Sequence, residues 1–316
     1  MIRILVFGTG SVGSVSNYDA VKSVGLRVRS TIFGEMQANP IVVQSVTEAM
    51  SLSERPYDFV LVCTKATPQS SSAAIESIRL AITPRLTTIV LIQNGLGVER
   101  VFYDAFPETT IFSGVAYLPT TQITPAVFSH SEVDLLYLGI SNISLGLSNP
   151  MAQLLSFAEY LKEGGATVVL SEDIQAERWK KVLANGAINP ICALSRCRDR
   201  QLIELSPLAA PLIRQVMFEI AAVAASAGYG HVVTTETVEK QFARSLTRPY
   251  PGVEPSMMAD AIASRPMEVQ AILGEIIQTA QDNSVKVPRL TMLLVLLEGL
   301  DLALQGERNR LAEAET

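Results

Sequence analysis

The chain begins with an apolar run, Ile2 to Phe7, which leads directly into Gly8-Thr9-Gly10-Ser11-Val12-Gly13. In a G-x-G-x-x-G turn the first glycine makes the turn from strand to helix. The second lets the backbone approach a pyrophosphate, and the third lets the helix pack close to the strand. The pattern alone is weak evidence, but its place directly behind an N-terminal strand strengthens it. The start of the chain therefore favours a parallel α/β fold that binds a dinucleotide.

The residues after this turn have two interpretations. In the first, Ser14 to Val24 is the phosphate-binding helix and Leu26 to Ser30 is the second strand, so that Arg27 or Arg29 meets a 2′-phosphate. This helix would carry polar residues where a buried face is needed. These residues are Ser16, Asn17, Tyr18 and Asp19.

In the second interpretation the first helix and the second strand are missing altogether. Asn17 to Val24 is then already the next helix, and it leads through Gly25 into a strand that ends near Phe33. We favour this second interpretation, which leaves the dinucleotide site incomplete.

Length and composition indicate an enzyme-sized chain of two domains. Its 316 residues exceed the size at which one core usually stops growing, and 48% of them are hydrophobic. The net charge of −6 argues against binding to nucleic acid or to an anionic membrane. Three cysteines and two histidines form neither a disulfide framework nor a zinc site, so no metal is expected. We expect a cytoplasmic protein without a signal peptide or a membrane span.

The pattern of apolar residues changes near residue 172. Residues 1–172 are predicted to form a doubly wound, Rossmann-like domain, because helical stretches alternate with short apolar runs. The predicted strands are Ile2–Phe7, Ile41–Val46, Phe59–Cys63, Thr88–Ile92, Thr110–Tyr117, Ala126–Ser129, Leu135–Gly139 and Thr167–Leu170. The predicted helices among them are Ser70–Ile82 and Pro150–Gly164.

Residues 173–316 are predicted to form an all-α domain. The predicted helices are Ile174–Arg196, Pro207–Ala227, Thr235–Arg248, Pro266–Asn283 and Arg289–Glu307.

Several polar residues lie at positions typical of catalytic or ligand-binding side chains. Lys181, Asn185 and Asn189 are spaced four apart and would form one row on one helix face, among mostly apolar neighbours. Residues 93–97 (Gln-Asn-Gly-Leu-Gly) and Thr64-Lys65 each follow a predicted strand, at the edge where open α/β sheets bind ligands. A further cluster consists of Ser256, Asp260 and Glu268, although solvated side chains are the simpler explanation for its carboxylates.

These motifs together resemble the ketopantoate reductase family, the 2-dehydropantoate 2-reductases, over nearly the whole chain. The matching elements are GTGSVG at Gly8, VCTKA around Lys65, QNGLG around Asn94, ERWKKVLANGAINP from Glu177 to Pro190, and the spacing from Ser256 to Glu268. Two departures stand out. A helix and a strand of the family are lacking between Gly13 and Asn17, and Asp199 falls where the family has a further asparagine.

The resemblance implies a role for each matching residue. Lys181 would be the general acid, supported by Glu268, when hydride reaches a ketone. The residues implied to hold the substrate are Asn94, Asn185, Asn189 and Ser256. The residues implied to hold NADP are Gly8, Gly10, Ser11, Val12, Gly13, Lys65 and Asn94. Residues 173–316 would form a substrate and dimerisation domain, which is compatible with a homodimer.

Three classes of function follow. The first is an NADPH-dependent reductase of a 2-oxo acid or related ketone. The second is a cofactor-independent enzyme, such as a lyase or cyclase, on the same scaffold, because the shortened N-terminal segment weakens the case for NADPH. The third is a non-catalytic binding protein, or a gene model that lacks an exon. We expect Lys181, Asn185, Asn189, Ser256 and Glu268 to converge on a cleft between the domains, facing Lys65 and Asn94.

Overall fold

The computed structural model describes residues 2–8, 15–52, 54–142 and 149–314. The chain divides into two compact units, each of which takes two segments. The first unit comprises Met1–Gln93 and Val98–Ile174, and the second comprises Asn94–Gly97 and Gln175–Thr316. The short loop Asn94–Gly97 therefore belongs to the second unit, although the residues on both sides of it belong to the first.

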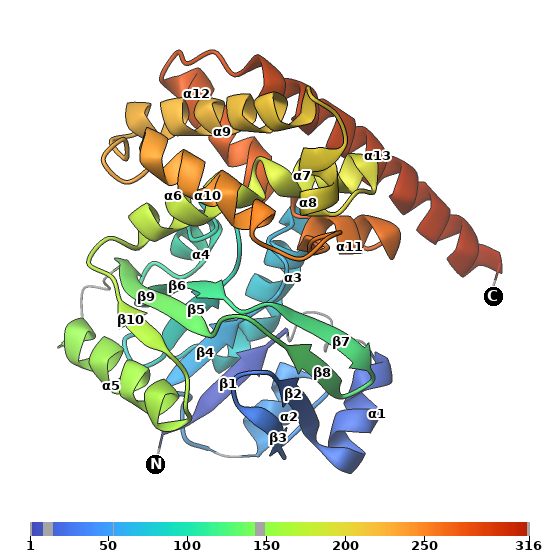
Figure 1. The fold of residues 1–316 in the computed structure, drawn as a ribbon. Helices are drawn as coiled ribbons and strands as arrows, with labels where there is room; N and C mark the ends of the chain where they lie inside the picture. The colour runs from blue at the N-terminus through green and yellow to red at the C-terminus, as the bar shows by residue number, and fades with distance from the viewer. Residues whose placement is uncertain (1, 9–14, 53, 143–148, 315–316) are drawn as a thin grey trace. The chain divides into compact units, whose positions relative to one another are not determined.

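The first unit contains a mixed six-stranded sheet. In spatial order its strands are β1 (Ile4–Phe7), β4 (Phe59–Val62), β5 (Thr88–Ile92), β6 (Ile111–Tyr117), β9 (Leu135–Asn142) and β10 (Val168–Leu170). β1, β4, β5 and β6 run parallel, whereas β6 and β9 are antiparallel. Together with the helices that flank it, this sheet confirms the predicted Rossmann-like α/β class (Figure 1).

Helices cover both faces of this sheet. The helices of the first unit are α1 (Val15–Val24), α2 (Val46–Ser51), α3 (Pro68–Ile78), the short 3₁₀ helix η2 (Arg79–Ala81), α4 (Arg100–Ala105) and α5 (Pro150–Glu163). Val60 and Val62 of β4 join the hydrophobic cluster that includes Ile78 of α3, whereas Phe59 joins the cluster that includes Phe157 of α5. Because alternate side chains of a strand point to opposite faces, β4 is buried on both sides, as its unbroken apolar sequence predicts.

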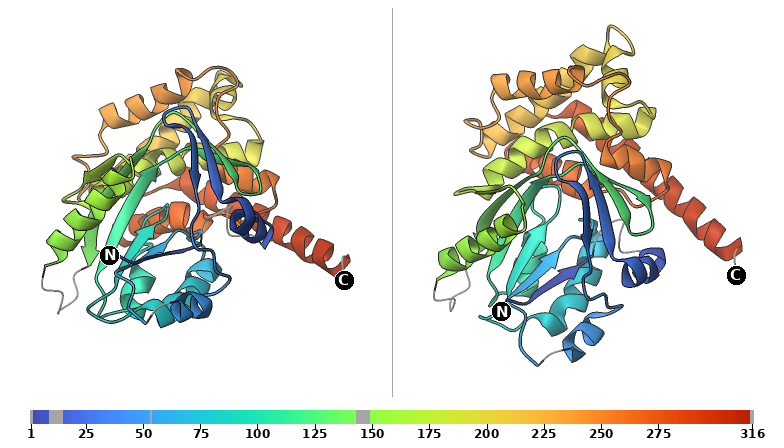
Figure 2. Two further views of the ribbon diagram at one scale, coloured as in Figure 1. Left: turned by 90° about the horizontal axis from the view of Figure 1, so that it is seen from below. Right: turned by 60° about the horizontal axis from the view of Figure 1, so that its bottom comes forward.

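A second, four-stranded sheet lies in the same unit. In spatial order its strands are β3 (Gly34–Ala38), β2 (Leu26–Ser30), β8 (Val127–His130) and β7 (Thr120–Thr124). β2 pairs antiparallel with β3 and parallel with β8. The fully buried Asn17 of α1 exchanges hydrogen bonds with Gln122 of β7 and accepts one from the backbone N–H of Ala126, so α1 is attached to this sheet (Figures 1 and 2).

Each interpretation of the N-terminal segment is right in part. The bounds of α1 and β2 match the first interpretation, whereas the sheet to which β2 belongs agrees with the second. β2 is not the neighbour of β1, which among the described strands pairs with β4 alone and so lies at the edge of the first sheet. In the first interpretation β2 would have lain beside β1, with α1 packed against that sheet. The strand also ends at Ser30 rather than near Phe33.

Some predicted elements of the first unit are wrong. Ile41–Val46 is not a strand, because Ser45 caps α2: its side chain accepts a hydrogen bond from the backbone N–H of Glu48, and Glu48 accepts one from the N–H of Gln44. The S-x-x-E spacing of Ser45 and Glu48 is the sequence signal for this helix start. β3 and β7 were not predicted, since these strands are polar and almost entirely exposed.

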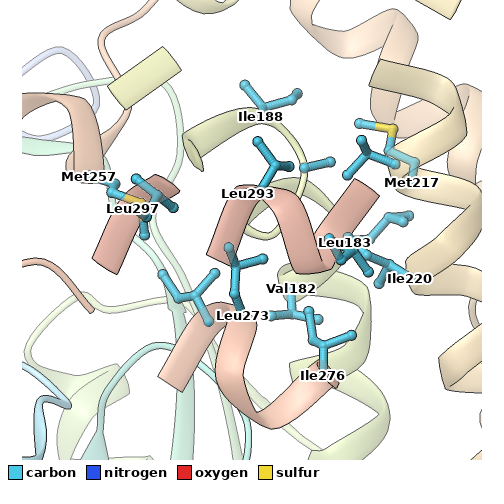
Figure 3. Packing of buried hydrophobic residues seen from close by; sticks show 14 of the residues in the cluster. Val182, Leu183, Ile188, Met217, Ile220, Met257, Leu273, Ile276, Leu293 and Leu297 are labelled. Atoms are coloured by element: carbon cyan, nitrogen blue, oxygen red, sulfur yellow. The ribbon is translucent and has the colours of Figure 1, made fainter. Parts of the chain in front are cut away.

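Apart from the loop Asn94–Gly97, the described part of the second unit is built from helices and their connections, which agrees with the end of strand signals near residue 172. Its helices are α6 (Ile174–Asn185), α7 (Ile188–Ser195), α8 (Asp199–Glu204), α9 (Ala209–Ser226), α10 (Thr235–Leu246), α11 (Ser256–Ile262), the π-helical turn η3 (Gln270–Gly274), α12 (Glu275–Asp282) and α13 (Pro288–Ala314). Figure 3 shows side chains from several of these helices in one continuous core, among them Leu183, Ile220, Leu273, Ile276 and Leu293.

The predicted helix Ile174–Arg196 is in fact two helices, α6 and α7, separated at Gly186 and Ala187. Pro190 explains the break. Its ring would clash with the carbonyl group of Gly186 four residues earlier, and it has no N–H to donate to that carbonyl. In the structure Pro190 lies in the first turn of α7, where an N–H is not needed.

α9 is long and apolar enough to cross a membrane by length and composition, but half of it is buried inside the protein. Its buried Glu219 accepts hydrogen bonds from the backbone N–H groups of Arg289 and Leu290 and pairs with the Arg289 side chain at 2.9 Å. This carboxylate accepts hydrogen bonds from backbone N–H groups at the N-terminus of α13, which have no partner within that helix. α9 therefore packs as a core helix of the second unit.

Candidate active site

Three of the predicted site residues form one hydrogen-bonded chain in the second unit. Lys181 Nζ, on α6, donates to Asn94 Oδ1 at 2.7 Å. Asn94 Nδ2 donates to Glu268 Oε2, which lies just before η3, at 3.2 Å. One amide therefore joins the lysine to the carboxylate, and these contacts fix which end of the amide faces each partner.

The loop Asn94–Gly97 is held in place by the second unit through its backbone. Arg178, one turn before Lys181 on α6, donates to the carbonyl oxygen of Gly95 at 2.9 Å, and Leu96 N–H donates to the carbonyl of Ala271 in η3 at 2.9 Å. Gly95 has φ +97°, and a Cβ atom there would lie 2.3 Å from the Ala271 carbonyl oxygen. Glycine is therefore required at this position, both for the backbone angle and for space.

The environment of Lys181 lowers the pKa of its amine. Burial lowers the pKa of Lys181 from its ordinary value of 10.5 to about 8, and the Glu268 carboxylate opposes this change. The Arg178 guanidinium, which is itself buried, lowers the pKa further. Lys181 is thus mostly protonated at neutral pH, yet it gives up its proton far more readily than a lysine in water.

Asn185 lies four residues after Lys181 on α6 and so shares its helix face. Asn189 does not extend this row, and that part of the prediction is wrong. Asn185 is the last residue of α6, whereas the buried Asn189 lies in the first turn of α7. The break at Gly186 and Ala187 separates Asn189 from the helix that carries Lys181 and Asn185. The four-residue spacing therefore defines a common helix face for Lys181 and Asn185 but not for Asn189.

Ser256 and Asp260 lie on α11, a helix that the sequence did not predict. Ser256 is its exposed first residue, after a segment rich in proline. Asp260 is buried and pairs with Arg265 at 3.0 Å, so this carboxylate has a partner within its own segment. α11 packs against α7, the helix that carries Asn189.

Asp199 holds the segment before α11 through several polar contacts. Its buried carboxylate accepts hydrogen bonds from the N–H groups of Arg200 and Val253, at 2.8 and 2.7 Å, and forms an ion pair with Arg248. A Cβ atom at Gly252 would lie 2.2 Å from the same carboxylate. Asp199, where the family has an asparagine, therefore connects α8 to the loop that leads into Ser256.

The residues predicted to hold NADP belong largely to the first unit. Gly8 has φ +70° and ends β1, where a Cβ atom would lie 2.1 Å from the Thr64 side chain. Lys65 follows β4 at the carboxyl end of the sheet, beside Thr64. Gly10, Ser11, Val12 and Gly13 lie outside the described residues. Asn94, the remaining residue of this set, belongs to the second unit.

Metal and thiol chemistry find no support in the described residues. No group of three His, Cys, Asp or Glu side chains among them is placed to hold a metal ion. The three cysteines are free. Burial raises the pKa of the Cys63 thiol to about 11 and that of Cys192 further still, so neither is a thiolate at neutral pH.

Comparison with known proteins identifies the family. Residues 4–142 match the model for "Ketopantoate reductase PanE/ApbA", and residues 173–301 match the model for its C-terminal part. The chain is also similar to the crystal structure of 2-dehydropantoate 2-reductase from Methylococcus capsulatus. The two share 29% sequence identity and a TM-score of 0.79, and the match covers 96% of this chain and 98% of that one.

Two fungal proteins are among its relatives. The meiotically up-regulated gene 72 protein of Schizosaccharomyces pombe is 27% identical over 94% of this chain, which spans about half (52%) of that protein. The uncharacterized protein YDL144C of Saccharomyces cerevisiae is 29% identical, with 94% of this chain and 93% of that protein covered. The latter alignment extends over 343 positions, more than the 316 residues of this chain, so that relative has residues that this chain lacks.

The two family models match successive parts of the chain, one on each side of residue 172. Each part has the fold that the family resemblance implies, an α/β part followed by a helical part. This chain belongs to the ketopantoate reductase family.

Proposed function

We propose that this chain acts on the carbonyl group of a small 2-oxo acid or related ketone, with Lys181 as the general acid. The observation that carries the proposal is the linkage of Lys181, Asn94 and Glu268 within the second unit. It is supported by the similar structure of a 2-dehydropantoate 2-reductase, whose name describes reduction of such a compound.

The three linked side chains have different roles in the proposed proton transfer. Reduction of a ketone builds negative charge on its oxygen, and a lysine ammonium within hydrogen-bond reach stabilises that charge and then donates the proton. With a pKa near 8, Lys181 holds the proton at neutral pH and releases it at a small cost in free energy. Glu268 fixes the Asn94 amide, and that amide orients Lys181. Asn185, Asn189 and Ser256 are proposed to hold the substrate.

The described residues fit only part of a nicotinamide dinucleotide. Gly8 provides the tight turn after β1, and Gly8 to Gly13 would hold the pyrophosphate, while bound NADPH would supply hydride. β1, however, lies at the edge of its sheet among the described strands, where the strand that reads the adenosine ribose would otherwise stand. Among the described strands, none therefore occupies the position from which the adenosine ribose would be bound.

The edge position of β1 supports a second candidate function. An enzyme that has lost the ribose-reading strand could retain Lys181, Asn94 and Glu268 for proton transfer alone, as a lyase or cyclase on the same scaffold. A nonenzymatic binding protein would not need this linked set.

One pair of measurements tests these proposals. Purified, folded protein is titrated with NADPH, followed by cofactor fluorescence, and is then assayed for oxidation of NADPH with a panel of small 2-oxo acids and ketones. Turnover supports the reductase. Turnover of a carbonyl compound in the absence of nucleotide would favour the lyase or cyclase, and no turnover of any kind would contradict both.

A further inference from the structure

Lys181 lies in surroundings that make its ammonium ion easier to deprotonate than that of a lysine in water. Val182 and Leu183, the next two residues of α6, are buried in the core of the second unit, as Figure 3 shows, so this part of the helix is packed into the protein. Arg178 brings a permanent positive charge one helical turn away, and it is 2% exposed. An apolar environment and a nearby cation are the two conditions that make a lysine nucleophilic.

The groups beside Lys181 can also move protons. Asn94 Oδ1 holds the Nζ atom at 2.7 Å, and the Asn94 amide connects it to the Glu268 carboxylate. Formation of an imine needs a group that accepts a proton from nitrogen and a group that returns one to the departing oxygen. Glu268 is the nearby carboxylate that meets this requirement.

We propose that Lys181 is also a covalent carbonyl-binding residue, which forms a reversible imine with a 2-oxo acid without any nucleotide. The geometry that supports this is the Lys181 amine held by Asn94 and linked through it to Glu268. The choice of a 2-oxo acid rests on the proposed function, whereas the covalent step does not require hydride transfer.

The step is balanced without an oxidant or reductant. The neutral Nζ attacks the carbonyl carbon, and a C–N bond forms as the C=O π bond breaks. The nitrogen loses one of its two protons and the oxygen gains one, which gives a carbinolamine. The nitrogen then loses its remaining proton, the hydroxyl group is protonated and leaves as water, and a C=N bond remains. Glu268, held near Lys181 by the Asn94 amide, would be the base that receives these protons and the acid that returns them.

Lys180 provides a matched control at the next position of the same helix. Its side chain is 39% exposed and pairs with Glu177 at 2.9 Å, so it is a partly exposed lysine with a carboxylate partner. A difference in reactivity between the two lysines would therefore report on their surroundings rather than on the helix or the reagent.

The experiment uses the full chain, pyruvate as the probe, and sodium cyanoborohydride to convert an imine into a stable secondary amine. Peptide mass spectrometry then locates the N-linked carboxyethyl group, with no nucleotide present. We expect labelling of Lys181 to exceed that of Lys180 by at least about tenfold, because a lower pKa leaves more neutral amine. The variants Lys181→Gln and Lys181→Arg should lose the label, and Lys180→Ala should keep it.

Equal labelling of Lys180 and Lys181 in the wild-type chain would overturn the inference, and this comparison needs no variant to fold. The result is also separable from the proposed function. Labelled Lys181 without NADPH oxidation would support the imine and contradict the reductase. NADPH oxidation with unlabelled Lys181 would support the reductase and contradict the imine.

Discussion

Lys181 is the residue whose protonation state sets the pH range of the proposed reduction. Its pKa of about 8 means that the acid form is present below this pH and is lost as the pH rises through it. We expect turnover of a ketone to fall above about pH 8. In Arg178→Gln the loss of the positive charge raises the pKa of Lys181, so the fall should move to higher pH. A pH–rate profile for each protein measures this, and an unchanged profile in the variant would contradict the role of Arg178.

Removal of the Lys181 amine tests the general acid itself. We expect Lys181→Ala to lower kcat by at least about a hundredfold, the scale expected for loss of a positioned acid. Lys180→Ala, one residue away and solvated, should leave kcat nearly unchanged. Steady-state kinetics would measure both. Near-normal turnover of Lys181→Ala would move the chemistry to another residue.

At the scale of elements, the loop Asn94–Gly97 depends on close contact with η3. Gly95→Ala places a Cβ atom against the Ala271 carbonyl, so the loop must move. Gly228→Ala has a similar positive φ, +91° against +97°, but meets nothing within 4 Å. Both substitutions incur about 1–2 kcal/mol from the backbone angle, and we expect Gly95→Ala to cost at least about 1 kcal/mol more. Urea denaturation measures the difference, and equal losses would contradict the contact.

The attachment of α1 to the second sheet rests on one buried amide. Asn17→Ala removes the hydrogen bonds with Gln122 and leaves the N–H of Ala126 without this acceptor. We expect a loss of about 1–3 kcal/mol in the free energy of unfolding. Ser23→Ala, on an exposed position of the same helix, serves as the control and should change stability little. An Asn17→Ala protein as stable as the wild type would argue against this placement of α1.

Sequence patterns at this scale predict the buried elements better than the exposed ones. β4 and β5 were predicted almost to the residue, because strands covered on both faces are continuous apolar runs. β3 has no buried residue, so it carries no such signal. The break between α6 and α7 could have been inferred from Pro190, although the apolar pattern continues across it.

At the scale of the whole molecule, the edge position of β1 leads to a prediction about nucleotide binding. We expect the affinity for NADPH to be well below that of an intact dinucleotide site. Arg27→Ala and Arg29→Ala should not change it, because both residues lie on β2 in the second sheet. Titration by cofactor fluorescence measures all three proteins. Tight binding of NADPH that weakens in either variant would contradict this.

The sequence by itself determined the order and type of most elements, because apolar periodicity reports how each segment is buried. Its motifs also identified Lys181, Asn94 and Glu268 as candidates. Only the tertiary structure decided which strand lies beside which, since β2 has the same local pattern whether it pairs with β1 or with β8. It also decided that the loop Asn94–Gly97 belongs with the helices. Strand partners and such long-range contacts depend on residues far apart in the chain, which no local pattern encodes.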